Sequence, residues 1–114
     1  MCYVYILRCA GGSYYTGYTP DPVRRLRQHA AGQGGHYTRA FPPEGLAGLW
    51  RCEGATAARR LEYAVKHRLD RRGKEALLAC PARVGEVFPH LAAFVYTPLF
   101  TVTWEDCLEG RFDG

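Results

Sequence analysis

Five side chains of the kinds that hydrolytic enzymes use fall in the first two thirds of the chain: Tyr5, Tyr15, Arg25, His29 and Glu62. A guanidinium fits the non-bridging oxygens of a phosphate, and a carboxylate is a preferred ligand of hard divalent cations. Phenol and imidazole groups can position or move a proton. Together these residue types could hold an anion and a cation and move a proton, provided that the fold brings them to one place.

A β-hairpin must position the two tyrosines. Residues 3–9 and 14–18 are rich in β-branched and aromatic residues, which is typical of strands. The Gly-Gly pair between them supplies the positive φ of a two-residue turn. We therefore expect Tyr5 and Tyr15 on neighbouring antiparallel strands.

A helix must position the arginine and the histidine. Asp21 can cap its free N–H groups, Pro22 suits the first helical position because it has no N–H to offer, and Gly32 ends it. Arg25 and His29 are four residues apart, so both side chains project from one helical face. We expect that face to lie beside the apolar stripe of the helix, at the edge of the sheet.

The remaining elements are expected in this order: a loop at 33–44, a strand at 46–52, a helix at 54–69, a turn at 71–73 and a short helix at 74–80. The helix at 54–69 would carry Glu62. After irregular residues 81–90, we expect one or two short strands within 91–104. The predicted fold class is therefore α/β (α+β): a small three-stranded antiparallel sheet flanked by helices, with a C-terminal extension.

Composition narrows the class of protein. The 114 residues suffice for one domain, and almost half of them are apolar, which favours a packed core. No apolar run reaches the roughly 18 to 20 residues that span a bilayer, and the N-terminus has no charged leader, so we expect a cytoplasmic protein. The five cysteines are odd in number and contain no Cys-x-x-Cys pair, so free, mostly buried thiols are expected.

The net charge of +4 is unevenly distributed along the chain. Residues 1–74 carry a net charge of +8, and residues 75–114 carry −4. The basic part would attract a polyanion such as nucleic acid. An Arg-rich helix is also a common solvated surface, so charge alone does not establish that partner.

Four motifs in order resemble the GIY-YIG nucleases. They are the paired tripeptides Tyr3-Val4-Tyr5 and Tyr15-Thr16-Gly17, the helix signature Gly17-x-Thr19-x-Asp21-x-x-x-Arg25-x-x-x-His29, the loop Gly35-His36-Tyr37-Thr38-Arg39, and a later helical Glu62. The loop is similar to that of small stand-alone bacterial members. The nuclease domain of eukaryotic structure-selective endonucleases is similar as well, although this sequence holds no cysteine-rich zinc domain. Tyr3 replaces the family's Gly, and Val4 and Thr16 replace its Ile.

This resemblance implies a role for each candidate catalytic residue. Glu62 would bind one Mg²⁺ or Mn²⁺ ion, and Arg25 would hold the non-bridging phosphate oxygens. Tyr15 would be the general base, while Tyr5 and His29 would orient the nucleophile or exchange a proton with it. Each residue also has an ordinary structural reading, since Glu62 could be an intrahelical ion-pair partner and His29 could pack against the sheet.

The loop motif is implied to touch nucleic acid. His36 and Arg39 would contact the phosphodiester backbone, and Thr38 is a further candidate for the same contact. The GIY-YIG nuclease-like domain would span residues 1–80. Residues 81–114 match no pattern, and we expect this C-terminal extension to pack on the same domain.

The sequence therefore predicts a metal-dependent endonuclease that hydrolyses phosphodiester bonds, in DNA rather than RNA because of the resemblance. Recognition would depend on backbone charge and nucleic-acid structure, with little sequence specificity. One alternative is a nucleic-acid-binding module with weak or no turnover. Another is an interaction subunit of a DNA repair complex, which would bind a protein partner or self-associate through an acidic tail, if the tail's aromatics do not instead complete the core: Phe94, Tyr96, Phe100 and Trp104.

Overall fold

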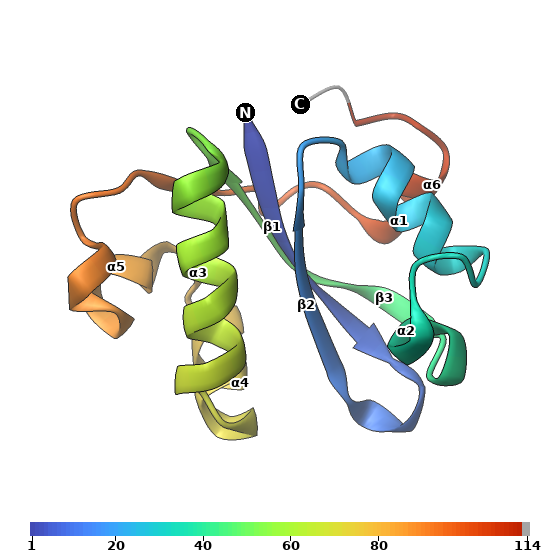
Figure 1. Ribbon diagram of the computed structural model, residues 1–114, viewed down its shortest axis with the longest axis horizontal. Helices are drawn as coiled ribbons and strands as arrows, with labels where there is room; N and C mark the ends of the chain where they lie inside the picture. Colours follow the sequence, from blue (N-terminus) through green and yellow to red (C-terminus); the bar gives the residue numbers. More distant parts are fainter. Residues whose placement is uncertain (113–114) are drawn as a thin grey trace.

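Strands rich in β-branched and aromatic residues form one antiparallel sheet in the computed structural model, which describes residues 1–112. Within that range the sheet has four strands in the order β2-β1-β3-β4 (Figure 1). The strands are β1 (Cys2–Cys9), β2 (Tyr14–Thr19), β3 (Pro43–Cys52) and β4 (Tyr96–Pro98). The helices are α1 (Pro22–Ala30), α2 (His36–Ala40), α3 (Ala55–Arg68), α4 (Arg71–Ala79), α5 (Val84–Val87) and α6 (Trp104–Leu108). Short 3₁₀ segments are η1 (Ala10–Gly12), η2 (Pro81–Arg83) and η3 (Pro89–Leu91).

Helices cover both faces of the sheet, which confirms the predicted α/β class. Alternation along β1 sends Val4 to one face, where it packs in a cluster with Leu61 of α3. Tyr5 points to the other face and packs in a cluster with Leu26 of α1. In Figure 1, α3 and α1 accordingly stand on either side of β2, the strand at the edge of the sheet. This edge is where side chains from both layers can meet.

The predicted turn and cap residues are largely confirmed. Gly11 and Gly12 have φ values of 83° and 82°, although a 3₁₀ segment rather than a two-residue turn joins β1 to β2. Asp21 caps α1, because its carboxylate accepts a hydrogen bond from the backbone N–H of Arg24 at 3.1 Å. Gly32, with a φ of 77°, follows the last turn of α1.

The prediction of a three-stranded sheet is wrong, because β4 adds a fourth strand within the described residues. β4 is three residues long and pairs only with the last residues of β3, Trp50–Cys52. A short strand was expected within 91–104, but the sequence pattern does not show which sheet such a strand joins, because strand pairing depends on tertiary packing. β3 also begins earlier than predicted, at Pro43, which lies opposite Cys9 after two register shifts.

Two segments predicted as turn and loop are helical. Residues 71–73 begin α4, because the Asp70 carboxylate accepts a hydrogen bond from the Gly73 N–H at 2.8 Å and caps the helix. Residues 36–40 form α2 inside the predicted loop. Five residues are too few to show a helical period, so such a helix escapes sequence reasoning.

The C-terminal extension contributes to the core. Leu91 is fully buried with side chains of α3, and Cys107 is fully buried on the α1 face. Three of the four tail aromatics pack partly buried against these clusters, whereas Phe100 is 70% exposed. We therefore propose that residues 1–80 and the described part of 81–114 form one folding unit. Residues 113 and 114 of the predicted extension lie outside the described residues.

Leu91→Ala tests this proposal. Removing a fully buried leucine side chain should lower the free energy of unfolding by about 2 to 5 kcal/mol, because burial is lost and a cavity remains. Val95→Ala is the control: Val95 is 58% exposed, so its loss should change stability by less than about 0.5 kcal/mol. Urea unfolding measures both, and equally small losses would contradict a shared core.

The cysteines behave as predicted. All five are free, and all except Cys80 are buried. Burial raises the pKa of the Cys52 thiol to about 12, so this thiol is protonated and unreactive at neutral pH. No helix within residues 1–112 is long and apolar enough to cross a lipid bilayer.

Candidate active site

Tyr5 reaches the edge of the sheet across a glycine. It lies on β1 opposite Gly17 of β2, and its phenol ring passes over that glycine. A Cβ atom at Gly17 would overlap the Tyr5 hydroxyl, so a larger residue would displace the ring. Because Tyr5 is 1% exposed, it is a group held inside the edge rather than on its surface.

A buried chain of hydrogen bonds joins three elements at this point. The Tyr5 hydroxyl is 2.8 Å from Nε2 of His29 on α1, and Nδ1 of His29 is 2.8 Å from the hydroxyl of Thr38 on α2. His29 and Thr38 are as buried as Tyr5. Gly34 permits this arrangement, because a Cβ atom there would overlap the imidazole ring. The chain therefore fixes α1 and α2 relative to β1.

Burial sets the charge states of the hydrogen-bonded Tyr5 and His29 side chains. It raises the pKa of Tyr5 to about 12, and the Arg25 guanidinium beside the phenol acts in the opposite direction. Tyr15 and Glu62 also raise that pKa, so both lie close enough to act on Tyr5 electrostatically. Burial, reinforced by Arg25, lowers the pKa of His29 to about 4. At neutral pH Tyr5 is therefore a neutral phenol, and His29 is a neutral imidazole with one donating and one accepting nitrogen.

The lowered pKa of His29 should make the fold sensitive to mild acid. In the unfolded chain the imidazole takes up a proton near pH 6.5, whereas in the folded chain it does so only near pH 4. The unfolded state binds more protons in this window, so stability should fall by up to about 3 kcal/mol as the pH falls through it. Urea unfolding of the wild type and of His29→Gln across these pH values measures the effect. An identical slope in the two proteins would contradict it.

Arg25 lies at the rim of this buried hydrogen-bond network. Its Nη1 donates to Oε1 of Gln28 at 3.1 Å, and its Nη2 donates to the carbonyl oxygen of Gly34 at 2.9 Å. None of the ion pairs within residues 1–112 involves this guanidinium. A guanidinium that is held in one orientation and lacks a carboxylate partner suits a phosphate.

Tyr15 is the phenol that solvent can reach. It is partly buried on β2, and its ring centroid is 5.2 Å from that of His29 and 5.7 Å from that of Tyr37, on which it stacks. Nζ of Lys66 lies 5.7 Å from the centre of the same ring. Tyr15 thus lies between His29 of the buried hydrogen-bond network, α2 and α3.

Glu62 reaches the same edge from α3. Its Oε2 is 3.8 Å from Nζ of Lys66, the cation that also lies over Tyr15. The Glu62 side chain is 20% exposed and acts electrostatically on Tyr5. The carboxylate therefore turns toward the β2 edge, where the phenols lie, and not toward the far side of α3.

The donor set at this edge fits a divalent cation that is also held by other ligands. Within residues 1–112, no group of three or more histidine, cysteine or acidic side chains could hold a metal ion. Glu62 offers one carboxylate with access to solvent. Mg²⁺ is commonly held by one or two carboxylates together with water and substrate phosphates. The donor chemistry thus suits Mg²⁺ or Mn²⁺ bound together with a phosphate.

The structure places the predicted site residues in two groups. The β2 edge gathers all five predicted catalytic side chains: Tyr5, Tyr15, Arg25, His29 and Glu62. His36 and Arg39 are exposed on α2, where the Arg39 guanidinium donates to Nδ1 of His36 at 3.1 Å. Thr38 is 1% exposed, so the expectation that it touches the phosphodiester backbone does not fit. Its hydroxyl instead supports the ring of His29.

Sequence reasoning missed two residues of this site. Lys66 was recognisable as an ion-pair partner one turn after Glu62, but its position over Tyr15 depends on how α3 lies against β2. Tyr37 stands inside the loop motif, and its stacking on Tyr15 requires a helix that the sequence did not predict. Both positions are set by tertiary packing.

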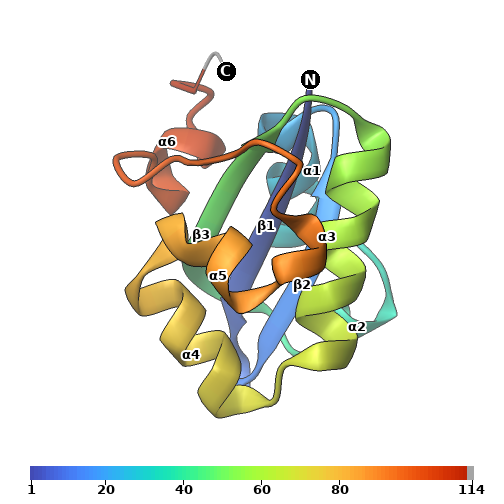
Figure 2. The same cartoon turned by 90° about the vertical axis from the view of Figure 1, so that its left-hand side faces the viewer.

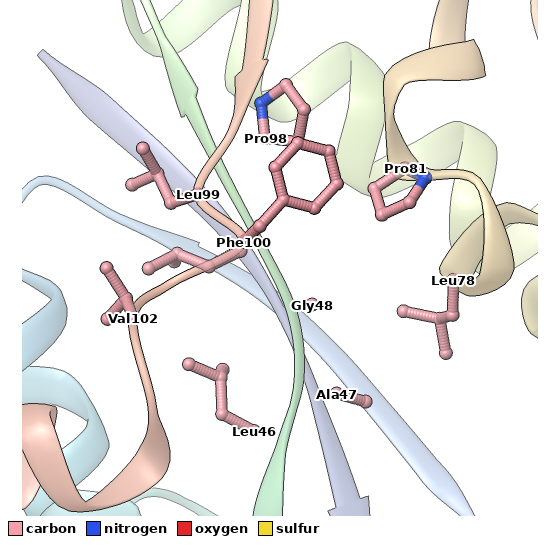
Figure 3. Close-up of a pocket in the computed structure, with 10 residues that line it drawn as sticks. Leu46, Ala47, Gly48, Leu78, Pro81, Pro98, Leu99, Phe100 and Val102 are labelled. Carbon is pink, nitrogen blue, oxygen red and sulfur yellow. The ribbon is translucent and has the colours of Figure 1, made fainter.

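Figure 3 shows an apolar hollow that none of these site residues lines. It has a volume of about 240 Å³ and is lined by β3, α4 and the chain around β4, with Leu46, Leu78 and Phe100 among its residues. None of its lining side chains is titratable or nucleophilic. The hollow offers no groups for catalysis, so the β2 edge is the candidate active site.

Comparison with protein families gives one match to this region. A family model described as the GIY-YIG catalytic domain matches residues 1–75. The matched range includes all five side chains that meet at the β2 edge, together with α2. It ends within α4, before the C-terminal extension.

Several curated proteins are similar over most of their own length. A UPF0213 protein of Halalkalibacterium halodurans is 51% identical over 77 residues, which cover 68% of this chain and 81% of the relative. A UPF0213 protein of Halobacterium salinarum is 44% identical over 77 residues, or 68% of this chain and 99% of the relative. One from Nitratidesulfovibrio vulgaris is 38% identical over 102 residues, or 90% and 89%. The solution NMR structure of a UPF0213 protein from Bacillus halodurans shares 46% identity, covers 76% of this chain and 93% of its own, and superposes with a TM-score of 0.48.

Proposed function

The chain belongs to the GIY-YIG catalytic domain family, and on that premise we propose that it is a divalent-metal-dependent endonuclease acting on phosphodiester bonds in DNA. Membership of this family indicates nuclease activity, and the UPF0213 name of the relatives assigns no substrate. One observation carries the proposal: Tyr15 on β2, Arg25 on α1 and Glu62 on α3 meet at a single edge of the sheet.

Phosphodiester hydrolysis needs a clamp on the phosphate. In this reaction the oxygen of water bonds to phosphorus, one P–O ester bond breaks, and the departing oxygen takes up a proton. Arg25 would hold the non-bridging oxygens, since its bonds to Gln28 and Gly34 fix the guanidinium before substrate arrives. Glu62 would hold the divalent cation, which supplies Lewis-acid chemistry when bound.

The two phenols would have different roles. Tyr15 is the phenol with access to solvent, so it would take the proton of the attacking water. The Lys66 cation near its ring would stabilise the negative charge that a base at this position needs. Tyr5 is buried and hydrogen-bonded to His29, so these two would act as positioning residues that hold α1 and its Arg25 against the sheet.

Recognition would depend mainly on the nucleic-acid backbone. His36 and Arg39 are exposed on α2, whose Tyr37 stacks on Tyr15, so they could reach phosphates next to the cleaved bond. Contacts of this kind carry no sequence information by themselves. We therefore expect cleavage that depends on the structure of the DNA and little on its sequence.

A cleavage panel tests the proposal. Single-stranded, duplex, flap and four-way-junction DNA, together with RNA, are incubated with the protein and Mg²⁺, Mn²⁺ or EDTA. We expect internal cleavage of at least one DNA in the presence of a divalent cation and none in EDTA. If the protein binds DNA but cleaves nothing in the panel, it is a binding module instead.

A further inference from the structure

A second cavity, of about 320 Å³, opens on the outer side of α3. Its lining residues are Thr56, Arg59, Arg60, Tyr63, Arg68 and His90. The last of these belongs to η3, and Figure 2 shows the chain that follows α5 beside α3. None of these side chains takes part in the candidate active site. The cavity is therefore a separate feature of the molecule, and we call it the α3 pocket.

The α3 pocket concentrates positive charge. Its three guanidinium groups have no acidic residue among them, and none of the ion pairs within residues 1–112 involves these arginines. Like charges held close together repel each other unless an anion or solvent compensates. Arg60 is also held in place, since its guanidinium lies 5.6 Å from the centre of the Phe94 ring. A cluster of guanidinium groups, one of which is held in place, is suited to the phosphates of a polyanion.

Tyr63 gives the α3 pocket a feature that phosphate binding alone does not need. The residue is 59% exposed, and its ring lies against His67 one turn on, with centroids 4.4 Å apart. An exposed ring supported by a second ring is a flat surface on which a nucleic-acid base can stack. In a duplex the faces of each base are already covered by its neighbours. The exposed Tyr63 ring therefore favours unpaired bases.

One helix carries both the α3 pocket and the acid of the candidate active site. Glu62 and Tyr63 are adjacent in the sequence, so their side chains leave α3 about 100° apart around its axis. An α-helix with its side chains is about 10 to 12 Å across. A single strand crossing α3 would thus join the pocket to the β2 edge over a few nucleotides.

We propose that the α3 pocket binds an unpaired segment of the nucleic acid that flanks the cleaved bond. Phosphates lie on Arg59, Arg60 and Arg68, and a base stacks on Tyr63. That this segment belongs to a cleaved substrate rests on the proposed function. The preference for a single-stranded polyanion with bases follows from the pocket itself.

Equilibrium binding in EDTA tests the α3 pocket without cleavage. The probes are a fluorescent single-stranded oligonucleotide, its duplex, and an abasic strand of equal length. Tyr63→Ala should weaken single-strand binding by about tenfold, because base–aromatic stacking is lost, and should affect the duplex much less. Arg59→Ala should make the dependence of log K on log[salt] shallower by about 0.7 for the phosphate contact it removes. The abasic strand should bind the wild type about as weakly as the normal strand binds Tyr63→Ala.

Two variants serve as matched controls. Arg72→Ala removes one exposed arginine of α4, and Phe100→Ala removes an exposed aromatic ring that lines the apolar hollow. Both should bind the single strand within about twofold of the wild type. Thermal unfolding of every variant checks that each one is folded. An abasic strand that binds as tightly as the normal strand, or a Tyr63→Ala protein with unchanged affinity for the single strand, overturns the proposal.

The α3 pocket and the proposed function fail in different ways. Cleavage by the wild type is measured separately, with Mg²⁺ or Mn²⁺ added. If the wild type cleaves DNA but its single-strand binding does not depend on Tyr63, the proposed role of the α3 pocket is wrong and the nuclease proposal stands. If the wild type binds a single strand through Tyr63 but cleaves nothing, the α3 pocket is a single-strand binding site and the nuclease proposal is wrong.

Discussion

Glu62→Ala should lower the rate of metal-dependent DNA cleavage by about a thousandfold or more, while DNA binding persists. We propose Glu62 as the ligand of the divalent cation at the β2 edge, so its loss would remove that ligand. The charge stabilisation supplied by such a cation contributes several kcal/mol, and each 1.4 kcal/mol changes the rate about tenfold. Binding should be equal or tighter, because Lys66 then lies near the phosphates without its acidic neighbour.

Glu75→Ala is the matched control for this prediction. Glu75 lies on α4, pairs with Arg71 at 3.8 Å and is half exposed, so its removal takes away one carboxylate from a helix that carries none of the proposed site residues. Single-turnover cleavage and fluorescence binding are measured for both variants. Cleavage that survives in Glu62→Ala at the rate of Glu75→Ala would show that the activity does not use this carboxylate.

Tyr15→Phe should lower the cleavage rate by about a hundredfold to ten-thousandfold, the range that proton transfer by a positioned side chain contributes. The substitution removes one oxygen and keeps the ring, which stacks on Tyr37 and touches His29. The free energy of unfolding should therefore change by less than about 1 kcal/mol. A large loss of rate with an intact fold would identify the hydroxyl, and not the ring, as the functional group.

Tyr18→Phe is the control on the same strand. Tyr18 is 38% exposed on β2 but points to the other face from Tyr15, since the two positions differ by an odd number of residues. Its cleavage rate should stay within about twofold of the wild type. If Tyr15→Phe cleaves as fast as Tyr18→Phe, Tyr15 is not the general base.

Local signals predicted the elements that hold the site. The Gly-Gly pair, the Asp21 cap and Gly32 bound the hairpin and α1, and the structure places all three where expected. α2 was missed, because its five residues show no helical period, whereas β4 lies where a short strand was expected but its pairing with β3 was not predicted. The three-stranded sheet was wrong for that reason.

The convergence of the site is a tertiary property. Tyr5 and Glu62 belong to opposite layers of the fold, and they approach each other only because β2 is the edge of the sheet. Gly17 contributes by leaving room for the Tyr5 ring, a role that its sequence motif does not reveal. Thr38 was expected to contact nucleic acid at the surface, because it belongs to a loop motif. In the structure it is buried, and its hydroxyl is hydrogen-bonded to His29.

The central claim is that Tyr15 and Glu62 act as parts of one hydrolytic site at the β2 edge. A double-mutant cycle tests it most directly: single-turnover cleavage rates are measured for the wild type, Tyr15→Phe, Glu62→Ala and the double variant. Substitutions of residues that act as a unit have strongly non-additive effects on the rate. The cleavage rate of the double variant should therefore lie within about threefold of that of the slower single variant. A double variant whose loss equals the product of the two single losses would show independent effects and contradict a shared site.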